Sequence, residues 1–534
     1  MSARLRSPAP WILLAVLALE FFLFDRFGAR RFTGVYPRWN DQTQYLGESY
    51  TAFEYARAHG FFAALWQSLT NVSAQGTLHD FFALIAFKLT GASRSAALAL
   101  NFLALAAWQL SLFAAVARAS ARPALGLAAA LLPLALTGPW QDIPGSAYDF
   151  RLDHLAMCAL GVTASCAWLA DRFQSRAGSV LFGVAVGLTL LTRFLTGTYF
   201  VVIFGGLLAW IAAGSDRRRG LLHLALAASI AFVLAAPVFW INLATIREYY
   251  LIGHYLGPES TIRASNLSIV GALRFLGDQL LNRHLGWFVV IVSAAAALVF
   301  AFLRRGESSP AKSPGWFIGA LFFFAPALVL FLHKQKSEVV VSALVPGLLI
   351  LAATVWIAAA RRASPLQLRL ASALIVLAAL GFFARQQTRS AFSVETLTET
   401  RRVNTLADEV YDRARRGGLR ELRVGVDYIT DALDAQALRI ICYERQKVWL
   451  AIDMTLPTGI FEPDEPTVMA RLAESDFFFL TAEGPEGGFP YDRKLVALRP
   501  QLRAWCDAHL RVANEFHLGG RRMLLYQRRN LPFP

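Results

Sequence analysis

Two acidic stretches of the sequence carry the side chains best suited to chemistry. In the first, YPRWNDQTQYL (residues 36–46), Asp41 stands among aromatic, amide and arginine side chains just after an apolar run. In the second, GPWQDIPGSAYDFRLDHLA (residues 138–156), Asp149, Arg151 and Asp153 alternate. A carboxylate can take a proton from a reacting hydroxyl. Taken singly, Asp41 fits a solvated acid or a helix cap, and the second stretch fits an internal salt bridge that caps the next helix.

Basic side chains on the same predicted side of the protein make a functional site the stronger interpretation. Fixed arginine and lysine donors stabilise the growing charge of a phosphate leaving group, and a carboxylate at a membrane boundary is costly unless it is paired or functional. The basic residues that could grip a phosphate there are Arg38, Arg193, His254, Arg263, His333, Lys334 and Lys336.

Composition indicates the elements that must position these residues. The chain has 534 residues, of which 56% are hydrophobic and 17% charged, which is too apolar and too long for one soluble domain. The net charge of +15 comes from short arginine clusters at the ends of apolar runs. That pattern is typical of cytoplasmic loops of membrane proteins rather than of a nucleic-acid-binding face. We therefore expect a polytopic α-helical membrane protein that binds no nucleic acid.

About eleven apolar segments approach the length needed to cross a bilayer. They begin near Trp11, Ser95, Arg122, His154, Val180, Thr196, Leu221, Gly286, Gly315, Val339 and Leu370. Alternate threading from a cytoplasmic N-terminus, with the first run retained as a helix, places the arginine clusters on the cytoplasmic side. The predicted outer loops are then residues 28–94, 138–153 and 241–285, with a short turn at 333–338.

The sequence after residue 384 has a different character. A helix over 394–416, strands at 422–426, 447–452 and 476–482, and a hairpin turning at Gly519 and Gly520 predict a small α/β domain. We therefore divide the chain into a membrane module, 1–384, and an outer domain, 385–534. Within the first outer loop, residues 50–69 and 78–89 are expected to form interfacial helices.

The four cysteines leave one possible disulfide undecided. Cys158 and Cys166 fall in one predicted membrane helix, where a thiol behaves as a small hydrophobe. Cys442 and Cys506 both fall in the outer domain and are equally compatible with pairing and with free thiols. The spacing of Cys and His favours no zinc site.

The organisation of about the first 380 residues resembles the GT-C superfamily of integral-membrane glycosyltransferases, in particular the bacterial branch with protein mannosyltransferases and lipid A aminoarabinose transferases. The matching features are a first membrane helix, a long outer loop with an early acid, a second acidic outer loop, the run LFGVAVGLTLLTRFLTG (residues 181–197) and the late basic turn LHKQKSE (residues 332–338). The terminal domain carries no matching motif.

The resemblance implies transfer of a sugar from a polyprenyl-phosphate donor to an acceptor hydroxyl at the periplasmic face of the bacterial inner membrane. Asp41 would match the catalytic acid of the first outer loop, and Asp149 or Asp153 the second acidic site. A single displacement would invert the anomeric centre. The residues that would bind the donor phosphate are Arg151, Arg193, His333, Lys334 and Lys336.

Several features stay open at this stage. Trp39, Tyr45, Trp140 and Tyr148 are candidates to stack on a sugar, although such rings often anchor a chain at the membrane interface. The first loop reads Asn40-Asp41-Gln42 where the family commonly has an Asp-Glu pair, which leaves open whether a divalent metal, Mg²⁺ or Mn²⁺, is needed. No other cofactor is expected. The acceptor can be a protein, a lipid or a growing glycan.

Two other classes of membrane protein remain as alternatives. A transporter or flippase of a lipid-linked sugar would be expected to carry charged or helix-breaking residues at mid-membrane, where this chain has mainly Ala, Leu, Val and Phe. A glycan ligase or polymerase would be expected to have a large outer loop between late helices, where this chain has only residues 333–338.

Overall fold

The computed structural model describes residues 7–29, 35, 40–141, 143–257, 267–302, 313–334, 336–361, 364–389, 394–427, 433, 435–449, 451–454, 465–484 and 493–531. The chain forms two compact units. The helical unit comprises residues 1–29, 61–91 and 95–390, and the α/β unit comprises residues 30–60, 92–94 and 391–534. Residues 30–60 of the first outer loop therefore belong to the same compact unit as the C-terminal residues.

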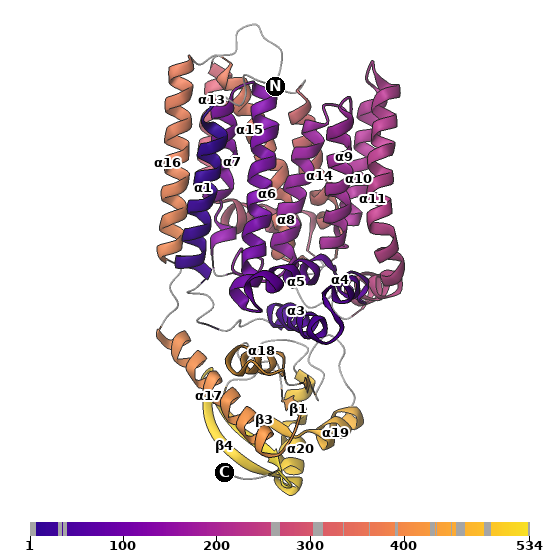
Figure 1. The fold of residues 1–534 in the computed structure, drawn as a ribbon, viewed down its shortest axis with the longest axis vertical. Coiled ribbons are helices and arrows are strands. Elements are labelled where there is room, and N and C mark those ends of the chain that lie inside the picture. Colours follow the sequence, from indigo (N-terminus) through magenta and orange to yellow (C-terminus); the bar gives the residue numbers. More distant parts are fainter. Residues whose placement is uncertain are drawn as a thin grey trace. The chain divides into compact units, whose positions relative to one another are not determined.

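The helical unit is built from long apolar helices joined by shorter segments (Figure 1). Its elements are α1 (Ala9–Leu23), η2 (Phe24–Ala29), α4 (Phe61–Thr70), α5 (Leu78–Thr90), α6 (Arg94–Ser120), α7 (Pro123–Ala130), η3 (Leu132–Ala135), η4 (Gly138–Trp140), α8 (Leu152–Leu169), α9 (Arg176–Thr192), α10 (Thr196–Ala212), α11 (Arg217–Ile246), η5 (Arg247–Leu256), α12 (Ile269–Asp278), η7 (Gln279–Leu285), α13 (Trp287–Phe302), α14 (Pro314–Leu332), η9 (Val339–Leu344), α15 (Val345–Ala360) and α16 (Pro365–Arg389).

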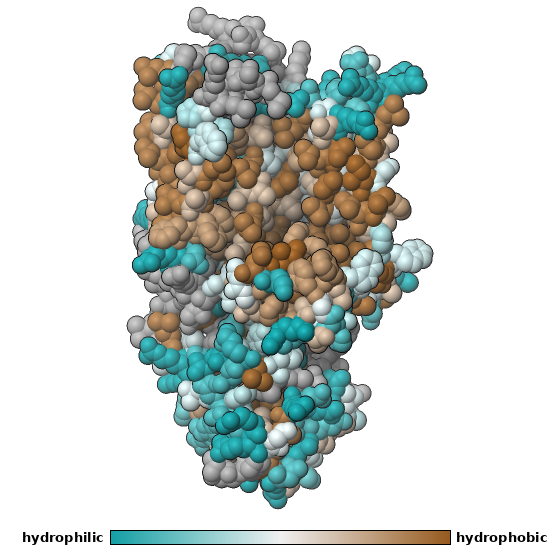
Figure 2. All heavy atoms as spheres, viewed as in Figure 1, coloured by the Kyte–Doolittle hydropathy of each residue, from teal (hydrophilic) through white to brown (hydrophobic). Residues whose placement is uncertain are grey.

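Several of these helices suit a bilayer. Within the described residues, 6 helical segments are long and apolar enough to cross a membrane, and three shorter apolar helices accompany them. The 6 segments span residues 94–120, 152–169, 217–256, 314–332, 339–360 and 366–387. Figure 2 shows a broad hydrophobic surface over these helices, with hydrophilic atoms at their ends. The chain is therefore a mostly helical membrane protein, but the expected number of about eleven spans is not confirmed.

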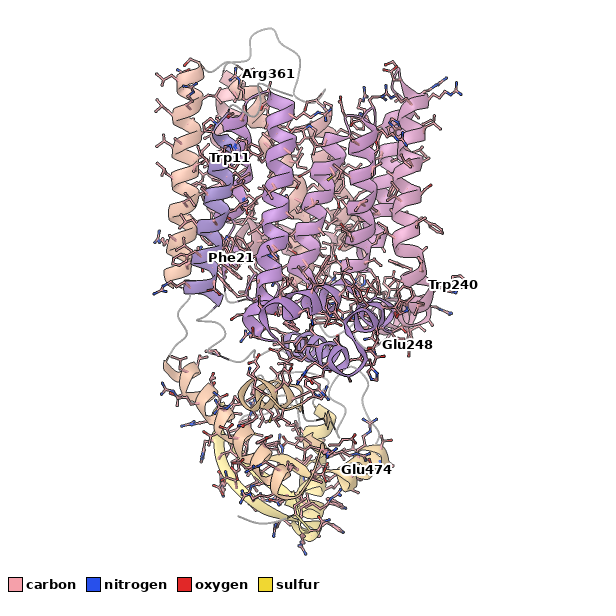
Figure 3. All side chains as sticks on the ribbon, in the orientation of Figure 1. Trp11, Phe21, Trp240, Glu248, Arg361 and Glu474 are labelled. Atoms are coloured by element: carbon pink, nitrogen blue, oxygen red, sulfur yellow. The ribbon has the colours of Figure 1, made fainter. Side chains whose placement is uncertain are left out.

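The two ends of the helical unit differ in the residues they carry. Trp11, near the start of α1, lies toward the same end as Arg361, which follows α15 (Figure 3). Trp240 and Glu248 lie toward the opposite end, where α11 continues into η5 (Figure 3). Helices α1 and α15 therefore run in opposite directions, as alternate threading requires.

Small residues allow α9 and α11 to pack closely. A methyl group added at Gly183 would lie 2.5 Å from the backbone oxygen of Ala227, and one added at Gly187 would lie 2.9 Å from the side chain of Leu234. Glycines four residues apart let helix backbones approach in membranes. Ser175 caps the start of α9 by accepting a hydrogen bond from the amide of Gly178. These contacts hold α9, whose last residue precedes Arg193.

The first outer loop is not one interfacial helix over residues 50–69. It contains α3 (Asn40–His59) and α4, which are separated at Gly60, where φ is +96°. That left-handed conformation suits glycine and ends a helix. The prediction of α5 over 78–89 is accurate to one residue. On α4, Phe62 and Trp66 are 84% and 69% exposed, in keeping with an interfacial position.

The α/β unit contains a five-stranded sheet in the order β2-β1-β3-β5-β4. Its elements are α3, α17 (Val394–Arg416), β1 (Glu421–Val426), α18 (Ala435–Gln446), β2 (Ala451–Met454), α19 (Glu465–Glu474), β3 (Phe477–Glu483), α20 (Arg493–His509), β4 (Leu510–Leu518) and β5 (Arg521–Arg528). Strands β2, β1 and β3 are parallel, whereas β5 is antiparallel to β3 and β4. The predicted hairpin is confirmed: Gly519 and Gly520 both have positive φ.

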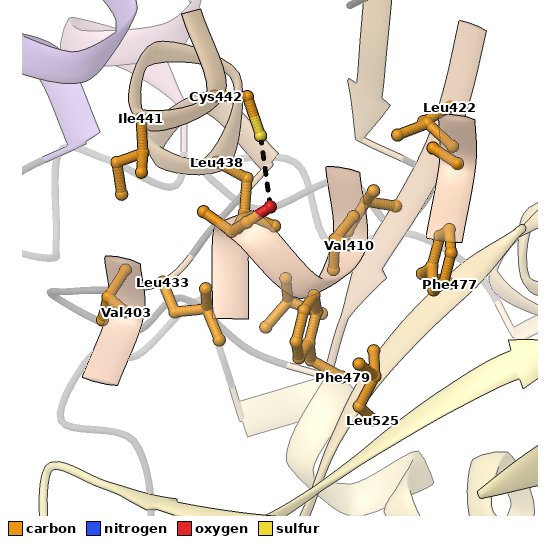
Figure 4. Close-up of a cluster of buried hydrophobic side chains, with 14 of the residues drawn as sticks. Val403, Val410, Leu422, Leu433, Leu438, Ile441, Cys442, Phe477, Phe479 and Leu525 are labelled. Atoms are coloured by element: carbon orange, nitrogen blue, oxygen red, sulfur yellow. Dashed lines mark hydrogen bonds between the residues drawn. The ribbon is translucent and has the colours of Figure 1, made fainter. Parts of the chain in front are cut away.

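Each face of this sheet carries its own core. Phe477 and Phe479 of β3 pack into one cluster with α17 and α18, and the alternate residues Phe478 and Leu480 pack into the other with α19 and α20. Figure 4 shows the first cluster, where the thiol of Cys442 donates to the backbone oxygen of Ala407 at 3.6 Å. This alternation follows from the two-residue period of a strand.

The structure decides one open question in this unit and corrects one prediction. Cys442 and Cys506, for which the sequence left pairing open, are free, because they lie in the cores on opposite faces of the sheet. The strand expected over 447–452 begins only at Ala451, and Lys447, with φ of +54°, follows the end of α18. A left-handed residue cannot continue a strand, so the apolar run is shared between a turn and β2.

Candidate active site

The second outer loop is held in one conformation by its own carboxylate. Oδ2 of Asp149 accepts a hydrogen bond from the amide of Gly145 at 2.6 Å and lies 2.8 Å from Nε of Arg151. Asn101 of α6 donates to the backbone oxygens of Ala147 and Asp149 at 3.0 and 2.9 Å. The predicted salt bridge within this loop is present, and it fixes Arg151 in a buried position.

Asp153 and Arg193 form a second ion pair, in which Asp153 is buried and Arg193 is partly buried. Asp153 lies in the first turn of α8, and Arg193 is the residue that ends α9. An acid at a helix start and a base at a helix end are each stabilised by the helix dipole. The phenols of Tyr199 and Tyr250 lie close enough to interact electrostatically with this pair. Asp153, which the sequence suggested as part of a cap for its own helix α8, is thus paired with Arg193 at the end of α9.

Gly145 brings these groups next to the late basic turn. Its φ is +83°, and a methyl group added there would lie 2.6 Å from Val339 of η9 and 3.5 Å from Cβ of Asp153. Only glycine fits this turn, because its backbone conformation and its surroundings both exclude a side chain. Asp149, Asp153 and the start of η9 therefore meet around Gly145.

The two lysines of the late turn have different environments. Nζ of Lys336 donates to the backbone oxygen of Phe331 at 2.9 Å and to that of His333, so it stabilises the end of α14. Burial lowers the pKa of Lys336. Lys334 is exposed, and its Nζ lies 4.8 Å from the centre of the Tyr255 ring. The ring of His333 is 6.0 Å from that of Tyr255. Lys334 is the better placed of the two lysines to meet a ligand.

Arg283 and His284 of η7 were not singled out in the sequence. Arg283 donates to the backbone oxygen of Pro144 at 3.4 Å, and burial lowers its pKa. Nε2 of His284 is 2.8 Å from the backbone oxygen of Glu338, and burial lowers the pKa of this histidine to about 4. The sequence did offer a signal for Arg283 and His284: they are basic residues at the predicted outer end of an apolar run, where the positive-inside trend would not place them.

His79 and Asp80 form another buried polar pair that the sequence analysis missed. His79 Nε2 lies 3.3 Å from Asp80 Oδ1, and the His79 ring is 6.4 Å from that of Phe150. The loop before α5 is tied to the end of α9, because the amide of Thr77 donates to the backbone oxygen of Leu191 at 3.0 Å and the amide of Phe194, just after α9, donates to that of Gln75 at 2.7 Å. A His-Asp pair in the otherwise apolar stretch LHDFFALIAF (residues 78–87) was the available signal.

Two of the aromatic candidates are core residues of the helical unit. The Trp140 ring is 4.5 Å from that of Phe383. Tyr148 stacks on Phe24 at 4.9 Å and donates to Gln387. Trp140 and Tyr148 are 0% and 2% exposed. Packing therefore accounts for both rings without a sugar.

The remaining candidates are divided between the two units and the residues outside the description: His254 lies in η5 of the helical unit, Asp41 and Tyr45 lie in the α/β unit, and Arg38 and Arg263 lie outside the described residues. Asp41 is in the first turn of α3, and Tyr45, one turn later, is buried. Trp39 lies outside the described residues. Because Asp41 belongs to one compact unit, and Asp149 and Asp153 to the other, the convergence of the two acidic loops stays a prediction.

Solved structures match nearly the whole chain. Crystal structures of ArnT from Cupriavidus metallidurans, in the apo state and bound to undecaprenyl phosphate, match with TM-scores of 0.64 and 0.62 at 14% identity, covering 99% of this chain and 100% of theirs. The oligosaccharyltransferase AglB from Archaeoglobus fulgidus matches with a TM-score of 0.45 at 11% identity, covering 98% of this chain and 75% of that one.

Searches by sequence identify nothing comparable. No protein-family model matches the chain, and no curated protein matches it significantly. The solved structures of ArnT support the predicted resemblance at the level of the fold alone, and the likeness includes the C-terminal residues, for which the sequence offered no motif.

Proposed function

We propose that this protein is a membrane glycosyltransferase that moves a sugar from a polyprenyl-phosphate carrier to an acceptor hydroxyl. One observation carries the proposal: the chain shares the fold of ArnT over 99% of its length, and it holds two ion-paired arginines, buried Arg151 and partly buried Arg193, at the ends of apolar helices. Charged groups in such positions are expensive unless they are paired or functional. A lipid phosphate is an anion that reaches this position from the bilayer.

The chemistry assigns separate tasks to acids and bases. Asp41 takes the proton of the acceptor hydroxyl as its oxygen attacks the anomeric carbon, a contribution typically worth about 10²–10⁴-fold. The bond to the phosphate oxygen breaks, and the lipid phosphate leaves with the electron pair. Arg193 and Lys334 stabilise the charge on that phosphate. A single displacement of this kind inverts the anomeric centre.

Asp149 and Asp153 have a supporting task in this scheme. Each carboxylate holds an arginine, Arg151 and Arg193 respectively, at the outer end of the helical unit. A positioned guanidinium loses less entropy when it binds a phosphate than a free side chain does. Mg²⁺ or Mn²⁺ remains an open requirement, and no step above depends on it.

The proposed setting is the bacterial inner membrane, with the N-terminus in the cytoplasm. The membrane module (1–384) would then present its outer loops, and the domain 385–534, to the periplasm. A reporter fused after Arg219 is expected to report cytoplasm, and one fused at the C-terminus is expected to report periplasm. A cytoplasmic C-terminus would overturn the assignment of the outer face.

Binding of undecaprenyl phosphate to the purified protein in nanodiscs tests the site. Arg193→Gln combined with Lys334→Ala should weaken binding by about ten-fold or more, because hydrogen bonds to charged groups are lost. Arg219→Ala is the matched control, since Arg219 is an exposed arginine at the start of α11. Equal binding by all three proteins would remove the phosphate assignment.

The sugar and the acceptor require a separate experiment. Mass analysis of envelope lipids, glycans and proteins from cells with and without this protein should reveal one sugar whose attachment depends on it. Flipping of a lipid-linked sugar across vesicles by the purified protein, without transfer to any acceptor, would favour a transporter instead.

A further inference from the structure

Helices α3 and α18 of the α/β unit are joined by reciprocal hydrogen bonds. The Tyr50 hydroxyl donates to Oε1 of Glu444 at 2.5 Å, and the Tyr443 hydroxyl donates to Oε1 of Glu54 at 2.7 Å. Tyr50 and Glu54 are four residues apart and share one face of α3. Each helix thus supplies one donor and one acceptor. We call Tyr50, Glu54, Tyr443 and Glu444 the tyrosine–glutamate clasp.

The two tyrosines of the clasp are shielded from water, and its two carboxylates are partly buried. Tyr50 is 0% exposed and Tyr443 is 5% exposed, and their ring centres are 4.8 Å apart. Trp449 packs edge-on against Tyr443 at 5.4 Å. Burial raises the pKa of both phenols, so both remain protonated donors at physiological pH. Hydrogen bonds to carboxylates are among the stronger ones in proteins, and deleting one from a buried site is costly.

The other end of α3 is held in a different way. Arg94 donates to Oε1 of Gln42 at 2.8 Å and to the backbone oxygen of Val35. Gln42 and Arg94 are both buried. Because Gln42 is the neighbour of Asp41, this bond lies beside the proposed base.

We infer that α18 of the C-terminal domain positions Asp41, and that the four clasp residues are positioning residues for sugar transfer. This inference rests on the proposed function, in which Asp41 takes the proton. Helix α3 is continuous from Asn40 to His59, so a displacement at Tyr50 is transmitted along it to Asp41. A misplacement of about 1 Å can cost about 10²-fold in rate. The C-terminal domain would thereby contribute to catalysis without a binding site of its own.

Hydrogen exchange on the full-length protein in nanodiscs tests the clasp without any substrate. Tyr50→Phe combined with Tyr443→Phe should accelerate exchange of the α3 amides by about ten-fold, because two buried hydrogen bonds are lost. Asp408→Asn is the matched control: it disrupts the bonds that Asp408 accepts from Arg445 and Gln446 at the α17–α18 contact. Unchanged exchange in α3 of the double variant would overturn the inference.

Kinetics then separate positioning from mere stabilisation. Tyr50→Phe should lower kcat by about ten-fold at unchanged KM for an undecaprenyl-phosphate-linked donor. In an Asp41→Asn background the same change should have no further effect, because the positioned base is absent. Glu444→Gln alone, in which the amide oxygen can still accept the Tyr50 hydrogen bond, should retain near-normal kcat. If Tyr50→Phe lowered kcat equally in the unaltered protein and in Asp41→Asn, the clasp would not act through Asp41. A change in KM alone would contradict the inference as well.

Failure of the proposed function gives a different result. The unaltered protein would then transfer no sugar from such donors, whereas the exchange experiment would still decide whether the clasp holds α3.

Discussion

Asp153 and Asp427 are both buried carboxylates paired with arginine, but their surroundings differ. Asp427 follows β1 and accepts bonds from the amide and hydroxyl of Thr481 at 2.9 and 3.2 Å and from Nε of Arg499 at 3.0 Å. Its side chain is 0% exposed. It therefore ties β1 to β3 and to α20. Asp153 and Arg193 join the ends of two apolar helices, and their side chains keep 8% and 16% exposure.

This difference shows that a buried ion pair does not by itself identify an active site. The Asp427 pair holds a soluble fold together, because the oxygens of Asp427 accept bonds from neighbouring elements of the sheet. The Asp153 pair joins the ends of two apolar helices of the helical unit, and under the proposed function its arginine also meets the lipid phosphate. The predictions below test that distinction, in order of expected effect.

The largest effect on turnover is expected at Asp41, because the other two candidate acids, Asp149 and Asp153, are already paired with arginines. Asp41→Asn keeps the size of the side chain but cannot take a proton, so turnover should fall by about two orders of magnitude or more while binding of undecaprenyl phosphate persists. A cap or surface acid would instead cost about 1 kcal/mol or less of stability. Near-normal turnover of folded Asp41→Asn protein would refute the proposed mechanism.

Arg193→Ala should destabilise the helical unit by about 3–5 kcal/mol, because it leaves the buried Asp153 carboxylate unpaired. Thermal unfolding in detergent measures this. Asp153→Leu added to Arg193→Ala should recover much of the loss, since no unpaired charge remains. If the double variant were as unstable as the single one, the ion pair would not be the source of the effect.

Asp427 should make the α/β unit less stable as pH rises. Burial raises the pKa of Asp427 to about 6 from an ordinary 3.8, so between these values the folded state binds a proton that the unfolded state has lost. Stability therefore falls through this window, by about 3 kcal/mol in total. Thermal unfolding at pH 4.5 and 7.5 should show this fall in the unaltered protein and much less of it in Asp427→Asn. Identical pH dependence would contradict it.

The smallest effect is expected at the cysteines. Oxidation should not link Cys442 to Cys506, because the two thiols lie on opposite faces of the sheet. Intact mass and non-reducing mobility should therefore be unchanged by mild oxidant. A loss of two mass units on oxidation that does not occur in Cys506→Ala would show that Cys442 and Cys506 form a disulfide. That result would contradict their placement on opposite faces of the sheet.

Local sequence determined much of the architecture. The apolar runs, the helix α17, the strands β1 and β3 and the Gly519-Gly520 hairpin were all predictable, because hydrophobic periodicity and glycine turns act over a few residues. The break at Gly60 and the late start of β2 were not. Both depend on a single residue with positive φ, at Gly60 and Lys447, and side-chain pattern alone does not reveal a backbone conformation.

Only the tertiary structure decided which charged groups meet. Residue type suggested that Arg193, Lys334 and Lys336 were equivalent phosphate ligands, but Arg193 is paired with Asp153 and Lys336 holds the end of α14. Likewise, α3 belongs to the α/β unit because of its bonds to α18, a helix almost four hundred residues later in the chain. Ion pairs and hydrogen bonds form between atoms a few ångströms apart, and that distance is set by how the helices pack rather than by spacing along the sequence.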